Sequence, residues 1–214
     1  MKVGVLGSGD VGRTLAQGFA ARGHDVKLGS RSPESPKLRA FRQKARGNIS
    51  IGSFRAAAEH GKIVVLSVHG DAAEAVLTAV GPDAFEGKLV IDTTNPLDFS
   101  GGAPTLFVGL TDSLGERVQR KIPQARVVKA FNTVSSEQMF EPTLPGKRPE
   151  MLICGNDAAA KRQVARIVRE FGWAGVLDIG GIEGARWLEP LVPLWVRLGT
   201  KLHTWKHMIR IERP

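Results

Sequence analysis

A glycine-rich turn near the start of the chain constrains the fold more than any other feature. Residues 7–12 read Gly-Ser-Gly-Asp-Val-Gly, which fits the pattern GxGxxG. A short apolar segment at residues 3–6 precedes the turn and is typical of a buried strand. Apolar side chains then recur every three or four residues from Val11 to Phe19, and Gly23 follows as a helix stop. The sequence therefore predicts a strand, a tight turn and a helix in direct succession.

In this context the glycine pattern favours a dinucleotide-binding site over a chance cluster of glycines. Gly7 permits the tight turn, Gly9 lets the backbone approach a pyrophosphate, and Gly12 lets the helix pack close to the strand. The free N–H groups and the positive dipole end of the helix then face the phosphates. We therefore expect the cofactor to contact Gly7, Ser8, Gly9, Asp10, Val11 and Gly12.

The end of the second expected strand, residues 26–28, indicates which dinucleotide is bound. NAD-binding versions usually place Asp or Glu there to accept hydrogen bonds from the ribose 2′-hydroxyl, but this chain has Gly29-Ser30-Arg31. Ser30 can donate a hydrogen bond to a 2′-phosphate, and Arg31 can pair with it in a bidentate manner. Arg31 could instead be a solvated loop charge. The residues favour NADP.

Strand and helix patterns alternate through the first half of the chain. The continuous apolar run Ile63-Val64-Val65-Leu66 predicts a strand buried on both faces, which is typical of a parallel sheet covered by helices. Right-handed crossovers then give a doubly wound topology. We predict an α/β fold, a doubly wound and mostly parallel Rossmann sheet with a small helical C-terminal extension. Further strands are expected at Ile49–Ile51, Ile63–Val68 and Leu89–Asp92, with helices around Phe54–Glu59 and Ala72–Val80.

The second half adds strands and helices and then becomes helical. We expect strands at 126–131, 151–154 and 176–179, helices at 113–121 and 158–171, and a Pro-rich loop at 141–149. From residue 181 onward apolar residues recur at helical spacing as far as Ile209, and Pro190 and Pro193 should kink or restart this segment. We therefore divide the chain into an NADP-binding domain, residues 1–180, and a C-terminal helical segment, residues 181–214.

Three later strand ends should border the nicotinamide half of the cofactor, because ligands of open α/β sheets lie outside the carboxyl ends of the strands. Asn132 could hold the carboxamide or a second cofactor. Asn95 could equally be a turn former before Pro96, and His69 could be a loop residue without a role. The expected contacts are Ser67, Val68, His69, Asn95, Pro96, Ala130, Phe131 and Asn132.

The composition favours a small anionic ligand over nucleic acid. The formal net charge is +9 and the pI is near 10.1. The basic residues are spread along the chain and do not alternate with aromatic residues. An Arg-rich surface without any ligand is the alternative.

Several other classes of site are excluded by the sequence. Cys154 is the only cysteine, so an internal disulfide cannot form. His203 and His207 have the spacing of zinc ligands on one helical face, but no third ligand accompanies them, and we expect no metal. No stretch reaches the roughly 18 uncharged apolar residues that span a bilayer, and Asp10 follows too soon for a signal peptide. We expect a cytoplasmic protein.

Five segments together resemble the F420-dependent NADP oxidoreductase family, which includes the cytosolic reductase domains of membrane ferric reductases. The resemblance runs through nearly the whole chain and implies a Rossmann fold, NADP(H) specificity and, commonly, a homodimer. The segments are Gly7–Gly12, Gly29-Ser30-Arg31, Asp92-Thr93-Thr94-Asn95-Pro96, Val128-Lys129-Ala130-Phe131-Asn132-Thr133 and Leu188-Glu189-Pro190-Leu191.

The family's namesake reaction is direct hydride transfer between NADPH and the deazaflavin F420. The protein stacks two reactive rings, and no acid, base or nucleophile is obligatory. The resemblance implies that Asn95, Pro96, Phe131 and Asn132 shape the ring pocket. It also implies that the C-terminal helix walls the deazaflavin or flavin side and pairs the subunits through Trp187, Leu191 and Trp195.

The sequence thus predicts an enzyme, an NADP-dependent oxidoreductase similar to F420-dependent NADP reductases. One alternative is an NADPH-dependent reductase of a flavin, a ferric chelate or a small imine or carbonyl substrate. Related hydroxyacid dehydrogenases use a Lys after a glycine-rich turn, but no Lys follows Gly180-Gly181 until Lys201. The other alternative is a non-catalytic NADP sensor whose Trp-rich C-terminal helix binds a partner.

Overall fold

The computed structural model describes residues 1–143, 146 and 148–212. One sheet contains β1 (Lys2–Leu6), β2 (Asp25–Gly29), β3 (Ile49–Gly52), β4 (Ile63–Leu66), β5 (Leu89–Asp92), β8 (Arg126–Lys129), β9 (Glu150–Gly155) and β10 (Gly175–Asp178). A separate hairpin contains β6 (Leu97–Asp98) and β7 (Thr105–Leu106). The main helices are α1 (Asp10–Ala21), α2 (Pro36–Lys44), α3 (Phe54–His60), α4 (Gly70–Val80), α5 (Leu114–Lys121), α6 (Ala158–Glu170), α7 (Ala185–Leu188) and α8 (Leu191–Leu202). Short 3-10 turns are η1 (Pro82–Phe85), η2 (Ser136–Gln138) and η3 (Ile182–Gly184).

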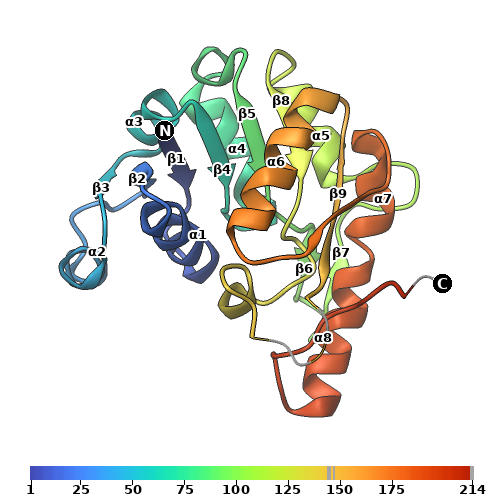
Figure 1. The fold of residues 1–214 in the computed structure, drawn as a ribbon. Coiled ribbons are helices and arrows are strands. Elements are labelled where there is room, and N and C mark those ends of the chain that lie inside the picture. Colours follow the sequence, from blue (N-terminus) through green and yellow to red (C-terminus); the bar gives the residue numbers. More distant parts are fainter. Residues whose placement is uncertain (144–145, 147, 213–214) are drawn as a thin grey trace.

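The sheet has the doubly wound order that the sequence predicts. Its strands are arranged β10-β9-β8-β5-β4-β1-β2-β3, with helices on both faces (Figure 1). The pairs from β3 to β8 are parallel, as is the pair β9–β10, whereas β8 and β9 are antiparallel. The structure therefore confirms an α/β fold with a mostly parallel Rossmann sheet and a C-terminal helix.

Burial on both faces explains why β4 is apolar along its whole length. Along β4, Ile63 and Val65 belong to one core cluster, and Val64 and Leu66 belong to the other. Side chains of α1, α2 and α6 fill the first cluster, and side chains of α3, α4, α5 and α7 fill the second. Successive strand residues point to opposite faces, so a strand covered on both sides favours apolar residues at successive positions.

The C-terminal segment corrects one prediction. Helix α8 ends at Leu202, because His203 adopts a left-handed conformation with a φ of 52°, and residues 206–212 are irregular. The tail instead folds back on the helix. The Trp195 ring stacks on His207 at 4.8 Å, and Trp195 Nε1 donates to the His207 carbonyl oxygen at 3.1 Å. The prediction that His203 and His207 share one helical face is therefore wrong.

The expected break before this helix is present, since α7 ends at Leu188 and α8 begins at Leu191. Residues 182–188 pack into the second core cluster through Ile182, Ala185 and Leu188. The division of the chain at residue 180 stays a prediction. Three positions of the expected loop at 141–149, residues 144, 145 and 147, lie outside the described residues, as do residues 213–214 of the C-terminal segment. Among the described residues, no helix has the length and apolar character needed to cross a membrane.

Candidate cofactor site

The glycine turn connects the end of β1 to the start of α1 and lies beside the end of β4. Gly7 has a φ of +123°, a backbone conformation that residues with a side chain rarely adopt. A Cβ there would lie 2.4 Å from the Ser67 carbonyl oxygen. A Cβ on Gly12 would lie 1.8 Å from the Gly7 carbonyl oxygen, so α1 packs against the turn only if no side chain intervenes. A Cβ on Gly9 would meet no atom within 4 Å. Packing within the protein thus explains Gly7 and Gly12, whereas Gly9 borders open space.

The start of α1 presents backbone amides to this open space. Gly9 precedes the helix and provides no side-chain cap, and the first helical hydrogen bond runs from the Arg13 amide to the Gly9 carbonyl oxygen at 3.0 Å. The Asp10 carboxylate pairs with the Arg13 guanidinium, which also donates to the Ser8 carbonyl oxygen at 2.8 Å. Val11 packs against the first core cluster. The positive end of the helix dipole therefore faces the open space, and the charge of Asp10 is compensated.

Ser30 and Arg31 follow β2, directly beside the glycine turn. The Ser30 hydroxyl is nearly buried and accepts two hydrogen bonds, from Ser8 Oγ at 3.1 Å and from the Ser32 amide at 3.2 Å. A serine oxygen has two lone pairs and one proton, so the Ser30 proton is left to donate outward. Arg31 is exposed. A preset donor and a solvent-facing cation thus lie side by side at this strand end.

The residues that follow β4 tie the strand ends together. Ser67 Oγ donates to the Leu6 carbonyl oxygen at 3.0 Å and thereby links the ends of β4 and β1. Val68 is half-buried and packs against the second core cluster. His69 is exposed and precedes α4 without forming a side-chain cap.

An amide pair joins the ends of β5 and β8. Asn95 Nδ2 donates to the Asn132 carbonyl oxygen at 2.9 Å, and Asn132 Nδ2 donates to Asn95 Oδ1 at 3.1 Å and to the Leu188 carbonyl oxygen at 3.2 Å. Asn132 is 4% exposed, and its Oδ1 has no hydrogen-bond partner among the described residues. Pro96 is buried next to this pair in the chain. The site therefore contains one buried acceptor whose bonding capacity is unused.

Ala130 and Phe131 have their side chains in the interior. Phe131 has a φ of 62°, is 1% exposed, and packs its ring edge-on against Trp173 at 6.4 Å. Ala130 is fully buried, and its amide donates to the Asp92 carbonyl oxygen at 3.0 Å. Any contribution of these two residues to a pocket comes through their backbone. The left-handed Phe131 also explains why β8 ends at Lys129, two residues before the predicted end.

All the residues predicted to bind the cofactor lie along one edge of the sheet. Strands β2, β1, β4, β5 and β8 are consecutive neighbours and mutually parallel, so their carboxyl ends share that edge. The glycine turn and Ser30 lie at one end of this row, and the Asn95–Asn132 pair lies at the other. This arrangement matches the crevice in which open α/β sheets bind ligands.

Sequence reasoning missed a buried ionic cluster beside this edge. Lys129 Nζ lies 2.9 Å from Asp92 Oδ2 and 2.7 Å from Glu189 Oε1, and it donates to the Thr94 carbonyl oxygen at 2.8 Å. All three charged side chains are at most 1% exposed. Burial alone lowers the pKa of Lys129, but the two carboxylates together outweigh burial and raise that pKa above its usual value. The signal in the sequence was a charged residue at the end of each of two apolar strands.

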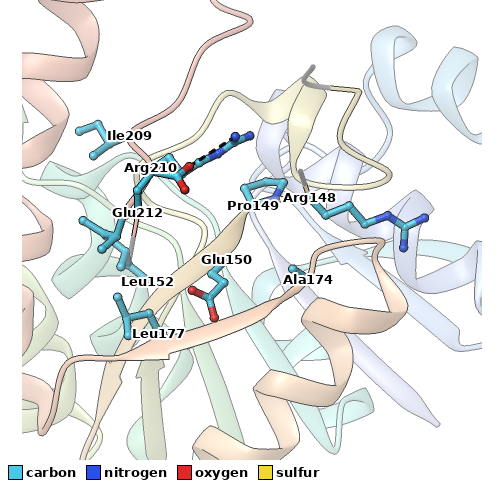
Figure 2. Close-up of a pocket in the computed structure, with 10 residues that line it drawn as sticks. Arg148, Pro149, Glu150, Leu152, Ala174, Leu177, Ile209, Arg210 and Glu212 are labelled. Atoms are coloured by element: carbon cyan, nitrogen blue, oxygen red, sulfur yellow. Dashed lines mark ion pairs between the residues drawn. The ribbon is translucent and has the colours of Figure 1, made fainter. Parts of the chain in front are cut away.

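Other features of the molecule lie apart from this edge. A cavity of about 260 Å³ lies between β9, β10 and the C-terminal tail, where Arg210 and Glu212 form an ion pair at 3.8 Å (Figure 2). None of the residues predicted to bind the cofactor lines it. Burial raises the pKa of the Cys154 thiol to about 12, so this cysteine is not a nucleophile at neutral pH. Within the described part of the chain, no group of three or more His, Cys, Asp or Glu residues could hold a metal ion.

Comparison with known proteins identifies the family. Residues 2–96 match the family model described as "NADP oxidoreductase coenzyme F420-dependent". The F420-dependent NADP reductase of Methanothermobacter marburgensis is 32% identical over 211 residues, which cover 94% of this chain and 93% of that protein. The chain belongs to this family.

Two further similarities extend the comparison. The crystal structure of a proposed F420-dependent NADP reductase from Arthrobacter sp. FB24 is 39% identical, covers 100% of both chains and superposes with a TM-score of 0.95. The metalloreductase STEAP3 of Rattus norvegicus is 29% identical over 91% of this chain, which spans 38% of that longer protein. A reductive aminase of Aspergillus terreus shares only the fold, with a TM-score of 0.67 at 17% identity.

Two alanine substitutions in the glycine turn should differ strongly in their effect on stability. Gly12→Ala places a methyl group against a backbone oxygen that cannot yield, and we expect it to lower the free energy of unfolding by about 3 kcal/mol or more. Gly9→Ala meets open space in an extended conformation that alanine adopts, so we expect a change within about 1 kcal/mol. Urea unfolding of the two variants measures the difference. Equal stabilities would contradict the packing described here.

Proposed function

We propose that this NADP-binding oxidoreductase transfers hydride between NADPH and a second ring cofactor, the deazaflavin F420. The relationship to F420-dependent NADP reductases over almost the whole chain carries the proposal. NADPH supplies the hydride, and the protein's residues bind and orient the reacting rings. Such a reaction needs close ring contact and no acid or base from the protein. The exposed His69 is the only titratable residue among those predicted to bind the cofactor beyond β4, which agrees with this requirement.

The residues after β2 fit the 2′-phosphate of NADP. A phosphate oxygen only accepts hydrogen bonds, and Ser30 has only its proton left to offer. NAD-binding sites usually read the ribose 2′-hydroxyl with an acidic side chain, and Gly29-Ser30-Arg31 contains none. The guanidinium of Arg31 supplies the charge. We infer that both residues select NADP over NAD.

The glycine turn fits the pyrophosphate. Open space above Gly9 leaves room for phosphate oxygens close to the backbone, and the uncapped amides of α1 are donors for them. The Asp10–Arg13 pair prevents an uncompensated carboxylate from repelling the phosphates. We assign the contacts from Gly7 to Gly12 to this part of the cofactor.

The Asn95–Asn132 pair fits the nicotinamide end. The buried Oδ1 of Asn132 is an acceptor without a partner among the described residues, and a carboxamide N–H group supplies the missing donor. The backbone of Ala130 and Phe131 and the loop at Ser67, Val68 and His69 flank the same edge. We assign these residues to the ring pocket together with Pro96.

A ferric or flavin reductase is the second candidate. The similarity to STEAP3, a metalloreductase, favours it over a non-catalytic NADP sensor. The chain spans only 38% of STEAP3, so that protein's remaining parts are not represented here. Both candidates share the NADPH site and differ in the acceptor.

We also propose a homodimer paired through α8. Leu194, Leu198 and Leu202 recur every four residues on this helix and are exposed, and Trp187 on the preceding helix is 64% exposed. Exposed apolar stripes of this kind mark association surfaces. The family resemblance also implies that the C-terminal helix walls the side of the site where the second cofactor binds.

Coenzyme preference tests the role of Arg31. We expect NADPH to bind at least about tenfold more tightly than NADH, since a charge-assisted pair contributes about 1.5–3 kcal/mol. Arg31→Glu should reverse this preference. Arg166→Glu on α6 changes the net charge equally, but α6 packs on β8, β9 and β10, so it should leave the preference intact. Equal affinities for the two coenzymes in a fluorescence titration of the parent protein would contradict the proposal.

The acceptor is tested by NADPH oxidation. Purified protein is mixed with NADPH and, separately, with F420, FMN, FAD and a ferric chelate, and absorbance at the nicotinamide band is followed. Turnover with F420 alone supports the proposed function. Turnover with flavin or ferric chelate supports the second candidate. Tight NADPH binding without turnover on any of them supports the sensor.

The dimer is tested by sedimentation equilibrium. A dimer has about 46 kDa, twice the subunit mass of 23.1 kDa. Leu194→Arg places a charge in the exposed apolar stripe and should yield monomers. Thr200→Arg lies six residues further along α8, on another face of the helix, and should leave the dimer intact. A monomeric parent protein would contradict the proposal.

A further inference from the structure

The cluster of Asp92, Lys129 and Glu189 is unusual because three charged side chains are removed from water together. Each is at most 1% exposed, and the three come from the end of β5, the end of β8 and the segment between α7 and α8. Removing charges from water costs several kcal/mol for each ion, and apolar residues of similar volume often give equal or greater stability. Stability alone therefore gives no reason for this cluster.

The hydrogen bonds of the cluster run to the backbone at two places. Asp92 Oδ1 accepts from the amide and the hydroxyl of Thr94 at 2.9 and 2.7 Å, and Lys129 donates to the carbonyl oxygen of the same residue. Glu189 accepts from the amides of Leu114 and Gly115 at 2.9 Å each, at the start of α5. The Lys129 ammonium group thus holds the Thr94 carbonyl oxygen directly. It also holds Glu189, which in turn accepts from the first amides of α5.

Both backbone positions continue directly into the Asn95–Asn132 pair. Thr94 precedes Asn95, and Glu189 follows Leu188, whose carbonyl oxygen accepts from Asn132 Nδ2 at 3.2 Å. The positions of Asn95 and Asn132 therefore depend on Thr94, which is hydrogen-bonded to the cluster, and on Leu188, which precedes Glu189 in the chain. A displacement of Thr94 or of the α7–α8 junction would move the amide groups at the strand ends.

We propose that Lys129 is a positioning residue for the ring end of the cofactor. Its ammonium group draws Asp92 and Glu189 together and thereby sets the Asn95–Asn132 pair, without contacting the cofactor itself. The inference rests on the proposed NADPH site. It predicts that the loss of the cluster affects the nicotinamide end, whereas the grip on the adenosine end at Ser30 and Arg31 is unchanged.

The decisive variant removes the charges while keeping the shape. In the triple variant Asp92→Asn, Lys129→Met, Glu189→Gln, one carbonyl oxygen remains for Thr94 and one for the two α5 amides, and no buried charge is left without a partner. We expect a melting temperature close to that of the parent, because the α5 hydrogen bond that is lost is offset by the removal of three buried charges. Lys88→Met, at the other end of β5, is the matched control, since its partly buried ammonium donates to the Ala58 carbonyl oxygen at 2.7 Å.

Three measurements locate the effect. Affinity for 2′,5′-ADP reports the adenosine end, fluorescence of bound NADPH reports the nicotinamide ring, and single-turnover kinetics report hydride transfer. We expect unchanged affinity for 2′,5′-ADP, an altered NADPH emission and a transfer rate at least about tenfold slower, because a shift of about 1 Å costs about 100-fold. The Lys88→Met control should match the parent in all three. If the triple variant does not fold, Glu189→Gln alone should alter the emission in the same direction and slow transfer about threefold or more.

The outcomes separate this inference from the proposed function. Parent-like NADPH emission in a folded cluster variant would overturn the positioning role. A loss of affinity for 2′,5′-ADP as large as the loss of affinity for NADPH would also overturn it, because the adenosine end would then be affected as well. NADPH emission needs no acceptor. It therefore tests the positioning role even if the parent protein passes hydride to none of the acceptors.

Discussion

Burial of the parallel sheet on both faces is the constraint on which the rest of the structure depends. Strands such as β4 contribute side chains alternately to two separate cores, so no central strand has a polar face. Polar chemistry is thereby confined to the ends of the strands. The carboxyl ends of five adjacent parallel strands, from β2 to β8, lie in one row, which includes the polar side chains of Ser30, Ser67, Asn95 and Asn132. Burial of the sheet therefore determines that the candidate cofactor site lies at the carboxyl ends of the strands.

Within this row, two kinds of polar group are set in different ways. At the β1–β2 end, backbone geometry dominates, since Gly7 and Gly12 admit no Cβ and the amides of α1 remain uncapped. At the β5–β8 end, side chains dominate, since Asn95 and Asn132 bond to each other and leave one buried acceptor open. The first arrangement suits phosphates, which accept hydrogen bonds. The second suits an amide, which also donates them.

The net charge of +9 creates a positive field around the whole molecule, which attracts anions in general. Arg31 is exposed beside the glycine turn, whereas Arg13 is committed to Asp10 and the Ser8 carbonyl oxygen. General positive charge raises the local concentration of an anionic coenzyme, but it does not distinguish one from another. Discrimination depends on directed bonds, and the proposed contact of Ser30 with the 2′-phosphate is of that kind.

The sequence by itself determined the fold class, the glycine turn and where along the chain the sheet strands lie, because these follow from local rules. Apolar runs indicate two-sided burial, and GxGxxG after a strand indicates a turn with tight backbone approach. Tertiary structure alone decided the rest. The antiparallel direction of β9, the buried position of the Phe131 ring and the end of α8 at Leu202 depend on packing between residues that are not neighbours in sequence. The Asp92–Lys129–Glu189 cluster unites residues up to 97 positions apart, the separation of Asp92 from Glu189, and only the folded sheet brings their charges within 3 Å of one ammonium group.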